Sequence, residues 1–271
     1  MSNTKNNSYD FFITAISTNI GKTIVSAMLC RFLYYNFFDI SKNTADNIKK
    51  IIYYKPIQTG AIFSKTTKKY ISCDCAFVEK ILAAPNTRTD QTEQKKNNNN
   101  YSFETVCSYL FKKPAAPYYA AKLENKKIEI SKIIDTYQRL KNNAHLITEG
   151  AGGLLTPILS TPFFYIDLLK LLKPQIILVA PAGLGSINQV LSAITITNVN
   201  ALKIYAIFLI YDNNKPNDIE LENYKFLKKI TKLQKIFLVN AVNNADTENL
   251  IIGDFFEKFQ NWQKYIKKLF I

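Results

Sequence analysis

Short apolar runs alternate with longer helical segments along most of the chain. The runs expected to form strands are residues 11–13, 51–54, 106–111, 144–148, 175–180, 203–211 and 236–239. Helical patterns are found at 24–33, 76–82, 131–140, 190–194, 219–233 and 246–269, the third with Ser131 as its expected N-cap. Near-continuous apolar runs such as 175–180 are typical of central parallel strands. We therefore expect an α/β fold over residues 1–271, a single domain with a doubly wound, mostly parallel sheet flanked by helices.

One stretch, at about 86–102, interrupts this alternation. It contains Asn97–Asn100 and few apolar residues, which is typical of low-complexity sequence. We expect a mobile insertion there rather than a domain boundary.

The first strand leads into a pattern typical of phosphate binding. Gly21, Lys22 and Thr23 stand between this strand and its helix, which is the layout of a P-loop. Glycine lets the backbone approach a phosphate, and a helix N-terminus attracts anions. Lys22 would reach the β- and γ-phosphates, and the Thr23 hydroxyl would bind Mg²⁺. The usual spacing places a glycine at position 16, where Ile16 stands, so an ordinary strand-to-helix turn is the alternative.

Charged side chains also follow other predicted strands. Lys55 ends the second strand and precedes a proline, at the edge where α/β folds collect ligands. Glu149 ends the strand 144–148 and precedes three glycines, a position where P-loop proteins use an acid to assist Mg²⁺. Asp74 fits either a helix cap or a second Mg²⁺ carboxylate. Taken alone, Lys55 could equally be a solvated lysine at the end of a strand.

Composition narrows the classes of function. The chain has 35 Lys and Arg against 21 Asp and Glu, a net charge of +14, but the lysines are spread along it. We therefore expect a solvated basic surface that suits anionic substrates, and no nucleic-acid partner. The chain has four cysteines without paired zinc-ligand spacing and one histidine, His145, within a strand, so we expect no zinc site. The polar N-terminus and the lack of a long apolar run predict a cytoplasmic protein without a membrane segment.

Four motifs in one order resemble the dethiobiotin synthetase family. They read T-A-I-S-T-N-I-G-K-T at 14–23, Y-K-P-I-Q-T-G at 54–60, E-G-A-G-G at 149–153 and G-L-G-S-I-N at 183–188. The family patterns are T-G-T-x-T-x-x-G-K-T, Y-K-P-x-x-[ST]-G, E-G-A-G-G and L-G-x-I-N. Each motif alone is shared across P-loop proteins, but the ordered set is specific, and the resemblance spans about 11–210.

This resemblance implies a P-loop NTPase-like fold and a C–N-bond-forming ligase of biotin synthesis. In the family, one amine of 7,8-diaminononanoate captures CO₂, supplied as bicarbonate, as a carbamate. The carbamate attacks the γ-phosphate of ATP, and the second amine then closes the ureido ring, giving dethiobiotin, ADP and phosphate. Mg²⁺ is the implied cofactor and ATP the implied co-substrate. A homodimer is also implied, in which the 183–188 loop completes the partner's site.

The resemblance assigns roles residue by residue. The implied catalytic residues are Lys55, Lys22 and Thr18. The implied nucleotide contacts are Asn19, Ile20, Gly21, Lys22, Thr23, Ile24, Glu149 and Gly152. The implied metal ligands are Thr23, Asp74 and Glu149. The implied substrate contacts are Thr18, Lys55, Thr59, Gly185, Ser186 and Asn188, with the 114–117 segment nearby.

Two departures from the family pattern leave alternatives open. Ala15 replaces the first loop glycine, and Ile210 stands nearest to a position that often holds an adenine-reading asparagine. Asn213 or Asn240 could replace that asparagine, or base selectivity could be relaxed. The competing functions are a partitioning- or cobyrinate-type ATPase and a non-catalytic nucleotide-binding protein. Partitioning ATPases usually carry an extra lysine early in the loop, which this chain lacks.

Overall fold

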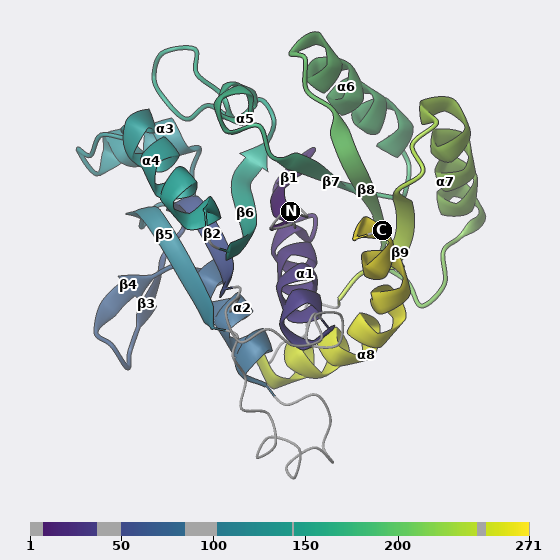
Figure 1. Cartoon of the computed structure of the whole chain (residues 1–271), viewed down its shortest axis with the longest axis horizontal. Helices are drawn as coiled ribbons and strands as arrows, with labels where there is room; N and C mark the ends of the chain where they lie inside the picture. The colour runs from purple at the N-terminus through teal and green to yellow at the C-terminus, as the bar shows by residue number, and fades with distance from the viewer. Residues whose placement is uncertain (1–7, 37–49, 85–101, 143, 243–247, 271) are drawn as a thin grey trace, which may run out of the picture.

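The computed structural model describes residues 8–36, 50–84, 102–142, 144–242 and 248–270. Seven parallel strands form its main sheet in the order β5-β2-β6-β1-β7-β8-β9 (Figure 1). The insertion predicted at 86–102 lies outside the described residues except for Ser102. The doubly wound α/β prediction is confirmed.

The elements have the following bounds. The sheet strands are β1 (Asp10–Ala15), β2 (Lys50–Thr59), β5 (Phe103–Phe111), β6 (Ala144–Gly153), β7 (Gln175–Pro181), β8 (Ile204–Tyr211) and β9 (Ile236–Asn240). A separate hairpin consists of β3 (Ile62–Ser64) and β4 (Lys69–Ile71). The helices are α1 (Lys22–Asn36), α2 (Cys73–Ala83), α3 (Pro117–Leu123), α4 (Ile130–Lys141), α5 (Tyr165–Leu172), α6 (Ser186–Val199), α7 (Asp218–Thr231) and α8 (Glu248–Ile266), followed by the 3₁₀ turn η2 (Lys267–Leu269).

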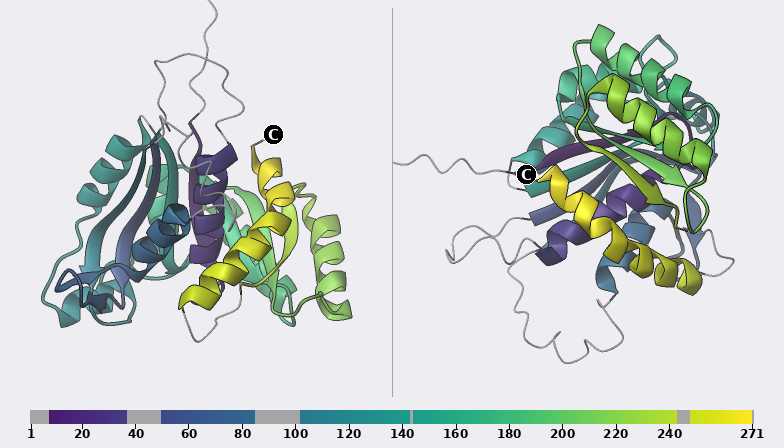
Figure 2. Two further views of the ribbon diagram at one scale, coloured as in Figure 1. Left: turned by 90° about the horizontal axis from the view of Figure 1, so that it is seen from below. Right: turned by 90° about the vertical axis from the view of Figure 1, so that its right-hand side faces the viewer.

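Helices cover both faces of the sheet (Figure 2). Alternate residues of each strand point to opposite faces, so Phe12 and Phe11 belong to two different buried clusters. The cluster around Phe12 packs against α3 to α7, and the one around Phe11 packs against α1, α2 and α8. Both faces are therefore apolar, which explains the near-continuous hydrophobic runs of the central strands.

The central position of β1 determines where ligands can bind. β1 pairs with β6 on one side and with β7 on the other. The strands β2, β5 and β6 are added on the first side and β7, β8 and β9 on the second, so the strand order reverses at β1. In open α/β sheets, ligands bind at the carboxyl ends of the strands beside such a switch point. The ends of β1, β2 and β6 meet at this edge, and each carries one of the predicted motifs.

Two strands extend further than the apolar pattern predicts. β2 continues through Thr59 because its partner β5 pairs with it as far as Phe111. β6 continues to Gly153 because β1 pairs with it there. Lys55 and Glu149 therefore lie within strands, whereas the sequence placed both at strand ends.

Other local predictions also need correction. Ser131 is an exposed residue of the first turn of α4, not its N-cap, because the helix begins at Ile130. Glu129 takes the N-cap position, and its backbone N–H donates to Tyr109 Oη at 2.9 Å. The hairpin β3–β4 and the helices α3 and α5 were not predicted. The hairpin strands and α3 are short, whereas the buried residues of α5 do follow a helical period that sequence reasoning missed. None of the described helices combines the length and apolar character needed to cross a bilayer.

Candidate active site

The phosphate loop joins β1 to α1. Gly21 has φ 87° and Asn19 has φ 56°, so the loop passes twice through the left-handed region before the helix begins. The Gly21 carbonyl accepts the Val25 N–H at 3.0 Å. A Cβ at Gly21 would lie 2.8 Å from Ile210 Cδ1, the end of a side chain that can shift, so it is the positive φ that requires glycine here.

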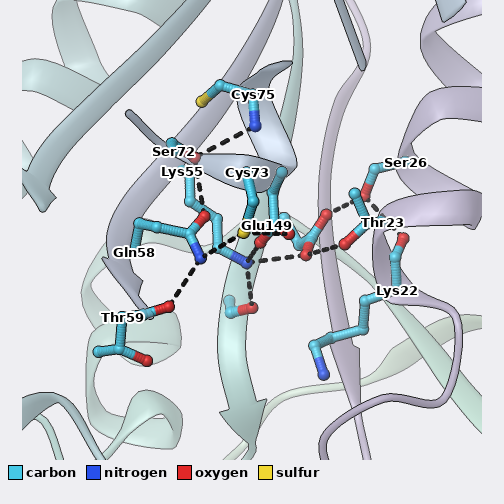
Figure 3. A network of polar contacts seen from close by, with 12 residues as sticks. Lys22, Thr23, Ser26, Lys55, Gln58, Thr59, Ser72, Cys73, Cys75 and Glu149 are labelled. Atoms are coloured by element: carbon cyan, nitrogen blue, oxygen red, sulfur yellow. Dashed lines mark hydrogen bonds and ion pairs between the residues drawn. The ribbon is translucent and has the colours of Figure 1, made fainter. Parts of the chain in front are cut away.

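Lys22 is buried in this loop and its ammonium donates to the Ser17 carbonyl at 2.9 Å. Burial lowers the pKa of Lys22 to about 8, although the carboxylate of Glu149 acts in the opposite direction. Figure 3 shows its side chain directed away from the Glu149 cluster. The Lys22 ammonium is thus held by a single described acceptor at the phosphate side of the loop.

Lys55 lies where β2 separates from β6. Pairing between these strands ends at Tyr54 and Thr148, and beyond this point β2 pairs only with β5. The buried ammonium of Lys55 is 2.6 Å from Asp74 Oδ2, 2.8 Å from Glu149 Oε1 and 3.2 Å from the Gly150 carbonyl (Figure 3). Burial lowers the pKa of Lys55, but the two carboxylates outweigh it and raise that pKa above its usual value. Lys55 is therefore an ammonium ion and not a base.

Asp74 is positioned by the start of α2. Ser72 is the N-cap, and its hydroxyl oxygen accepts the Cys75 N–H at 3.1 Å. The same hydroxyl donates to Gln58 Oε1 at 2.7 Å, which ties the helix start to β2. Burial raises the pKa of Asp74, but Lys55 outweighs this effect and the net pKa is lowered. Asp74 thus lies in the first turn of α2, and Ser72, not Asp74, is the N-cap.

Glu149 is a fully buried carboxylate with both oxygens occupied. Oε1 accepts from Thr23 Oγ1 at 3.0 Å and from Lys55 Nζ at 2.8 Å. Oε2 accepts from Ser26 Oγ (Figure 3) and from Tyr53 Oη, both at 2.8 Å. Sequence reasoning missed Ser26 and Tyr53. Their spacing was a usable signal, because Ser26 follows Lys22 by one helical turn and Tyr53 shares a strand face with Lys55.

The predicted metal ligands converge on one point. Asp74 and Glu149 contact the same ammonium nitrogen, and the Thr23 hydroxyl donates to Glu149. Hydroxyl and carboxylate oxygens are ligands that Mg²⁺ prefers, usually completed by phosphate oxygens and water. The described residues contain no cluster of three or more His, Cys, Asp or Glu side chains arranged for a metal. The donor set therefore fits Mg²⁺ bound together with a nucleotide phosphate.

A cavity of about 870 Å³ opens beside this cluster. Predicted site residues that line it are Thr18, Asn19, Thr59, Gly152 and Asn188, and the 114–117 segment lines it as well. Lys22, Lys55 and Glu149 do not line the cavity. However, Lys22 bonds to Ser17, which lines it, and Lys55 bonds to Gly150, which adjoins the lining residue Ala151. Lys22 thus contacts a residue of the cavity wall directly, and Lys55 contacts the neighbour of one.

The fourth motif lies at the start of α6. Gly185 has φ 85° and serves as the N-cap position, with open space around it. Ser186 is fully buried, and its hydroxyl donates to the Ala182 carbonyl at 3.2 Å. Asn188 is exposed and lines this chain's own cavity. The predicted substrate contacts of Gly185 and Ser186 stay predictions.

The two departures from the family pattern differ in their effect. Ala15 lies in the extended strand β1, where it pairs with Gly153 and Val179, so no glycine is required at this position. The Ile210 side chain lies beside Gly21. Asn240 Oδ1 accepts from Trp262 Nε1 at 3.1 Å, and Asn213 is exposed. Base selectivity stays open.

Solved structures of similar fold support the architecture alone. The ParA family ATPase from Chlorobium tepidum aligns with a TM-score of 0.50 at 12% identity, covering 96% of this chain and 99% of the other. The structure of pNOB8 ParA bound to nonspecific DNA aligns with a TM-score of 0.52 at 8% identity, covering 97% and 99%. At such identities the likeness shows a shared P-loop NTPase-like fold.

Sequence relatives are more specific. Residues 10–246 match the family model described as an AAA domain. The ATP-dependent dethiobiotin synthetase BioD of Clostridium botulinum (strain Eklund 17B) is 32% identical over 225 residues, covering 82% of this chain and 86% of the relative. The corresponding synthetase of Anoxybacillus flavithermus is 27% identical over 242 residues, covering 89% and 96%. With the motif order and the site geometry described above, these matches show that the chain belongs to the ATP-dependent dethiobiotin synthetase family.

Proposed function

We propose that this chain is an ATP-dependent dethiobiotin synthetase that converts 7,8-diaminononanoate, CO₂ and ATP to dethiobiotin, ADP and phosphate. The observation that carries the proposal is the Lys55 ammonium, held between Asp74 and Glu149 beside the phosphate loop. A reaction between a carbamate and a triphosphate brings two anions together. Fixed positive charge at that point offsets their repulsion.

The phosphate loop would bind the triphosphate. Backbone N–H groups at the start of α1 favour an anion, and Lys22 would exchange its Ser17 carbonyl partner for phosphate oxygens. Thr23, Asp74 and Glu149 would hold Mg²⁺, which supplies positive charge to the phosphates when bound. Glu149 keeps its orientation because Ser26 and Tyr53 hold its second oxygen.

Lys55 would bind the carbamate. Its raised pKa keeps it cationic, so it can donate hydrogen bonds to the carbamate oxygens while they attack the γ-phosphate. It does not remove protons from the amines. The cavity offers Thr18 and Thr59 as polar partners and Ile16, Leu154 and Ile196 as apolar walls, a combination suited to a diamine on an aliphatic chain.

The proposed function is tested by phosphate release with Mg·ATP and bicarbonate, with and without 7,8-diaminononanoate. We expect release that depends on the diamine. Lys55→Ala should abolish ring closure and leave ATP binding measurable, whereas Lys22→Ala should weaken ATP binding itself. Repeating the assay with CTP and GTP reports the base selectivity left open by Ile210.

The same assay separates the competing functions. Release that ignores the diamine indicates another P-loop ATPase. No release with any nucleotide, from folded protein, indicates a nucleotide-binding protein without catalysis. An equal loss of ATP binding in Lys55→Ala and Lys22→Ala would contradict the separate roles proposed for the two lysines.

We also propose a homodimer formed through α6. This helix has no charged residue, although the chain carries a net charge of +14. Most of its exposed residues follow one face together with the preceding Leu184: Asn188, Ser192, Thr195 and Val199. Gln189 and Asn198, which flank this face, are also exposed and uncharged. A charge-free face with exposed apolar residues is typical of subunit interfaces. Because Asn188 and Ser192 also line the cavity, such a contact would adjoin the site.

A further inference from the structure

The ammonium of Lys55 occupies the place where the two metal-binding carboxylates face each other. It lies 2.6 Å from Asp74 Oδ2 and 2.8 Å from Glu149 Oε1. All three side chains are largely buried, with exposed fractions of 4% for Lys55, 20% for Asp74 and 1% for Glu149. Two buried carboxylates require a compensating cation, and in this arrangement Lys55 supplies it.

The two oxygens of Glu149 have different donors. Tyr53 Oη donates to Oε2 from β2, and Ser26 Oγ on α1 shares its one hydroxyl proton between Oε2 and the Lys22 carbonyl; both side chains are buried. Oε1 accepts from Thr23 and Lys55. Because Thr23 and Lys55 share Oε1, a cation held by Thr23 and Glu149 together would compete with Lys55 for this oxygen.

Resting on the proposed function, we propose that Lys55 is an exchangeable counter-ion of Asp74 and Glu149. In the nucleotide-free protein its ammonium neutralises the two carboxylates. When a divalent cation binds with the nucleotide, Lys55 gives up Glu149 Oε1 and is directed to the carbamate side of the site.

Simple electrostatics supports the exchange. A divalent cation and an ammonium on the same carboxylate oxygen would repel each other in a poorly solvated site, so one replaces the other. The move is short, because Lys55 already donates to the Gly150 carbonyl, whose neighbour Ala151 lines the cavity. The ammonium can keep its hydrogen bond to the Gly150 carbonyl oxygen while it moves.

The exchange couples two binding sites. Binding of metal and nucleotide releases Lys55 for the carbamate, and a bound carbamate that holds Lys55 leaves the carboxylates free for metal. By linkage, each ligand must therefore strengthen the other to the same degree. Mg²⁺-nucleotide and the diamine with bicarbonate are then expected to bind cooperatively.

Metal binding without turnover provides the first test. Binding of Mn²⁺ to the full chain without nucleotide is measured from the free-Mn²⁺ electron paramagnetic resonance signal. Lys55→Met removes the competing ammonium and leaves both carboxylates, so we expect Mn²⁺ affinity to rise on the order of tenfold. The matched control is Lys50→Met, because Lys50 also lies on β2 and pairs with a carboxylate, that of Glu104, away from the site. Unchanged or weaker Mn²⁺ binding by folded Lys55→Met overturns the proposal.

A wild-type measurement provides the second test, should Lys55→Met fail to fold. Calorimetry gives the affinity of 7,8-diaminononanoate with bicarbonate, in the presence of a non-hydrolysable ATP analogue, with and without Mg²⁺. We expect Mg²⁺ to raise this affinity about fivefold or more; equal affinities overturn the exchange. Diamine-dependent phosphate release reports separately on the proposed function, so loss of coupling with release intact rejects the exchange alone.

Discussion

At the scale of single residues, the site is a balanced set of buried charges. Two cations, Lys22 and Lys55, balance the charge of two anions, Asp74 and Glu149. The neutral hydroxyls of Ser26 and Tyr53 also donate hydrogen bonds to Glu149. Buried charges are tolerated only when they are paired and hydrogen-bonded. The two lysines differ in their surroundings, because only Lys55 makes direct contact with carboxylates. Burial therefore dominates the pKa of Lys22, and ion pairing dominates that of Lys55.

Nucleotide affinity should fall at alkaline pH because of Lys22. Its pKa is lowered to about 8 by burial, so the free protein loses this cation as the pH rises through that value. A bound triphosphate favours the charged form, so binding above that pH takes up a proton. Between pH 7.5 and 9.5, where the triphosphate is fully ionised, we expect affinity to fall by up to about tenfold per pH unit above the pKa.

Calorimetry in buffers of different ionisation enthalpy measures both the affinity and the proton uptake. Lys22→Arg is the control, because arginine stays charged over this range and should give a flatter profile. A wild-type affinity that does not change up to pH 9.5 would contradict the expected role of Lys22.

At the scale of elements, the site depends on where strands separate and helices begin. β2 leaves β6 after Tyr54, which places Lys55 at the gap. The start of α2 brings Asp74 to that gap, and the start of α1 brings Thr23 and Ser26. The starts of α1 and α2 therefore position side chains of the candidate site.

Ser72→Ala should destabilise the protein more than Ser131→Ala. Ser72 caps α2 and bonds to Gln58, so its loss should lower the free energy of unfolding by about 1–2 kcal/mol. Ser131 is exposed within the first turn of α4 and is not the N-cap, so its replacement should change that free energy by less than about 0.5 kcal/mol. Urea unfolding measures both variants. Equal losses would show that Ser72 is not the structural cap.

At the scale of the whole molecule, the distribution of charge separates α6 from its neighbour α7. The exposed face of α7 carries Lys225, Lys228 and Lys229, whereas α6 has no charge. Leu184 and Val199 mark the two ends of the α6 face, with exposed fractions of 92% and 81%. Such exposure of apolar side chains suits a surface that is covered by a second copy.

Val199→Glu should therefore convert the proposed homodimer to a monomer. The change places a charge on the α6 face, outside the residues that line the cavity, and burying that charge in an interface is costly. Ile230→Glu on α7 is the control, because Ile230 is also exposed, at 50%, and should leave the assembly unchanged. Light scattering after size-exclusion chromatography measures the mass. A monomeric wild type, or a Val199→Glu protein that remains dimeric, would contradict an α6 interface.

The sequence by itself determined the α/β class and the phosphate loop. The spacing of apolar residues indicates which segments are strands and which are helices. The central strands are apolar almost throughout because helices cover both faces of the parallel sheet. Lys22 and Thr23 were identified from the loop motif, and Lys55, Asp74 and Glu149 from their places beside predicted strands or helices and from the order of four motifs. The helical period of α5 was missed although the sequence carries it. Local patterns failed for the β3–β4 hairpin and for the N-cap of α4, where the contact of Tyr109 with Glu129 accompanies the cap.

Only the tertiary structure decided which charges meet. Lys55 and Glu149 are 94 residues apart in the chain, and their contact depends on adjacent strands that separate at one residue pair. The recruitment of Ser26 and Tyr53 to one oxygen of Glu149 depends on the packing of α1 over β2 and β6. Sequence motifs identify which types of side chain the site contains. The distances between these side chains and their burial depend on the register of the sheet. Those two quantities determine which donors reach each oxygen of Glu149.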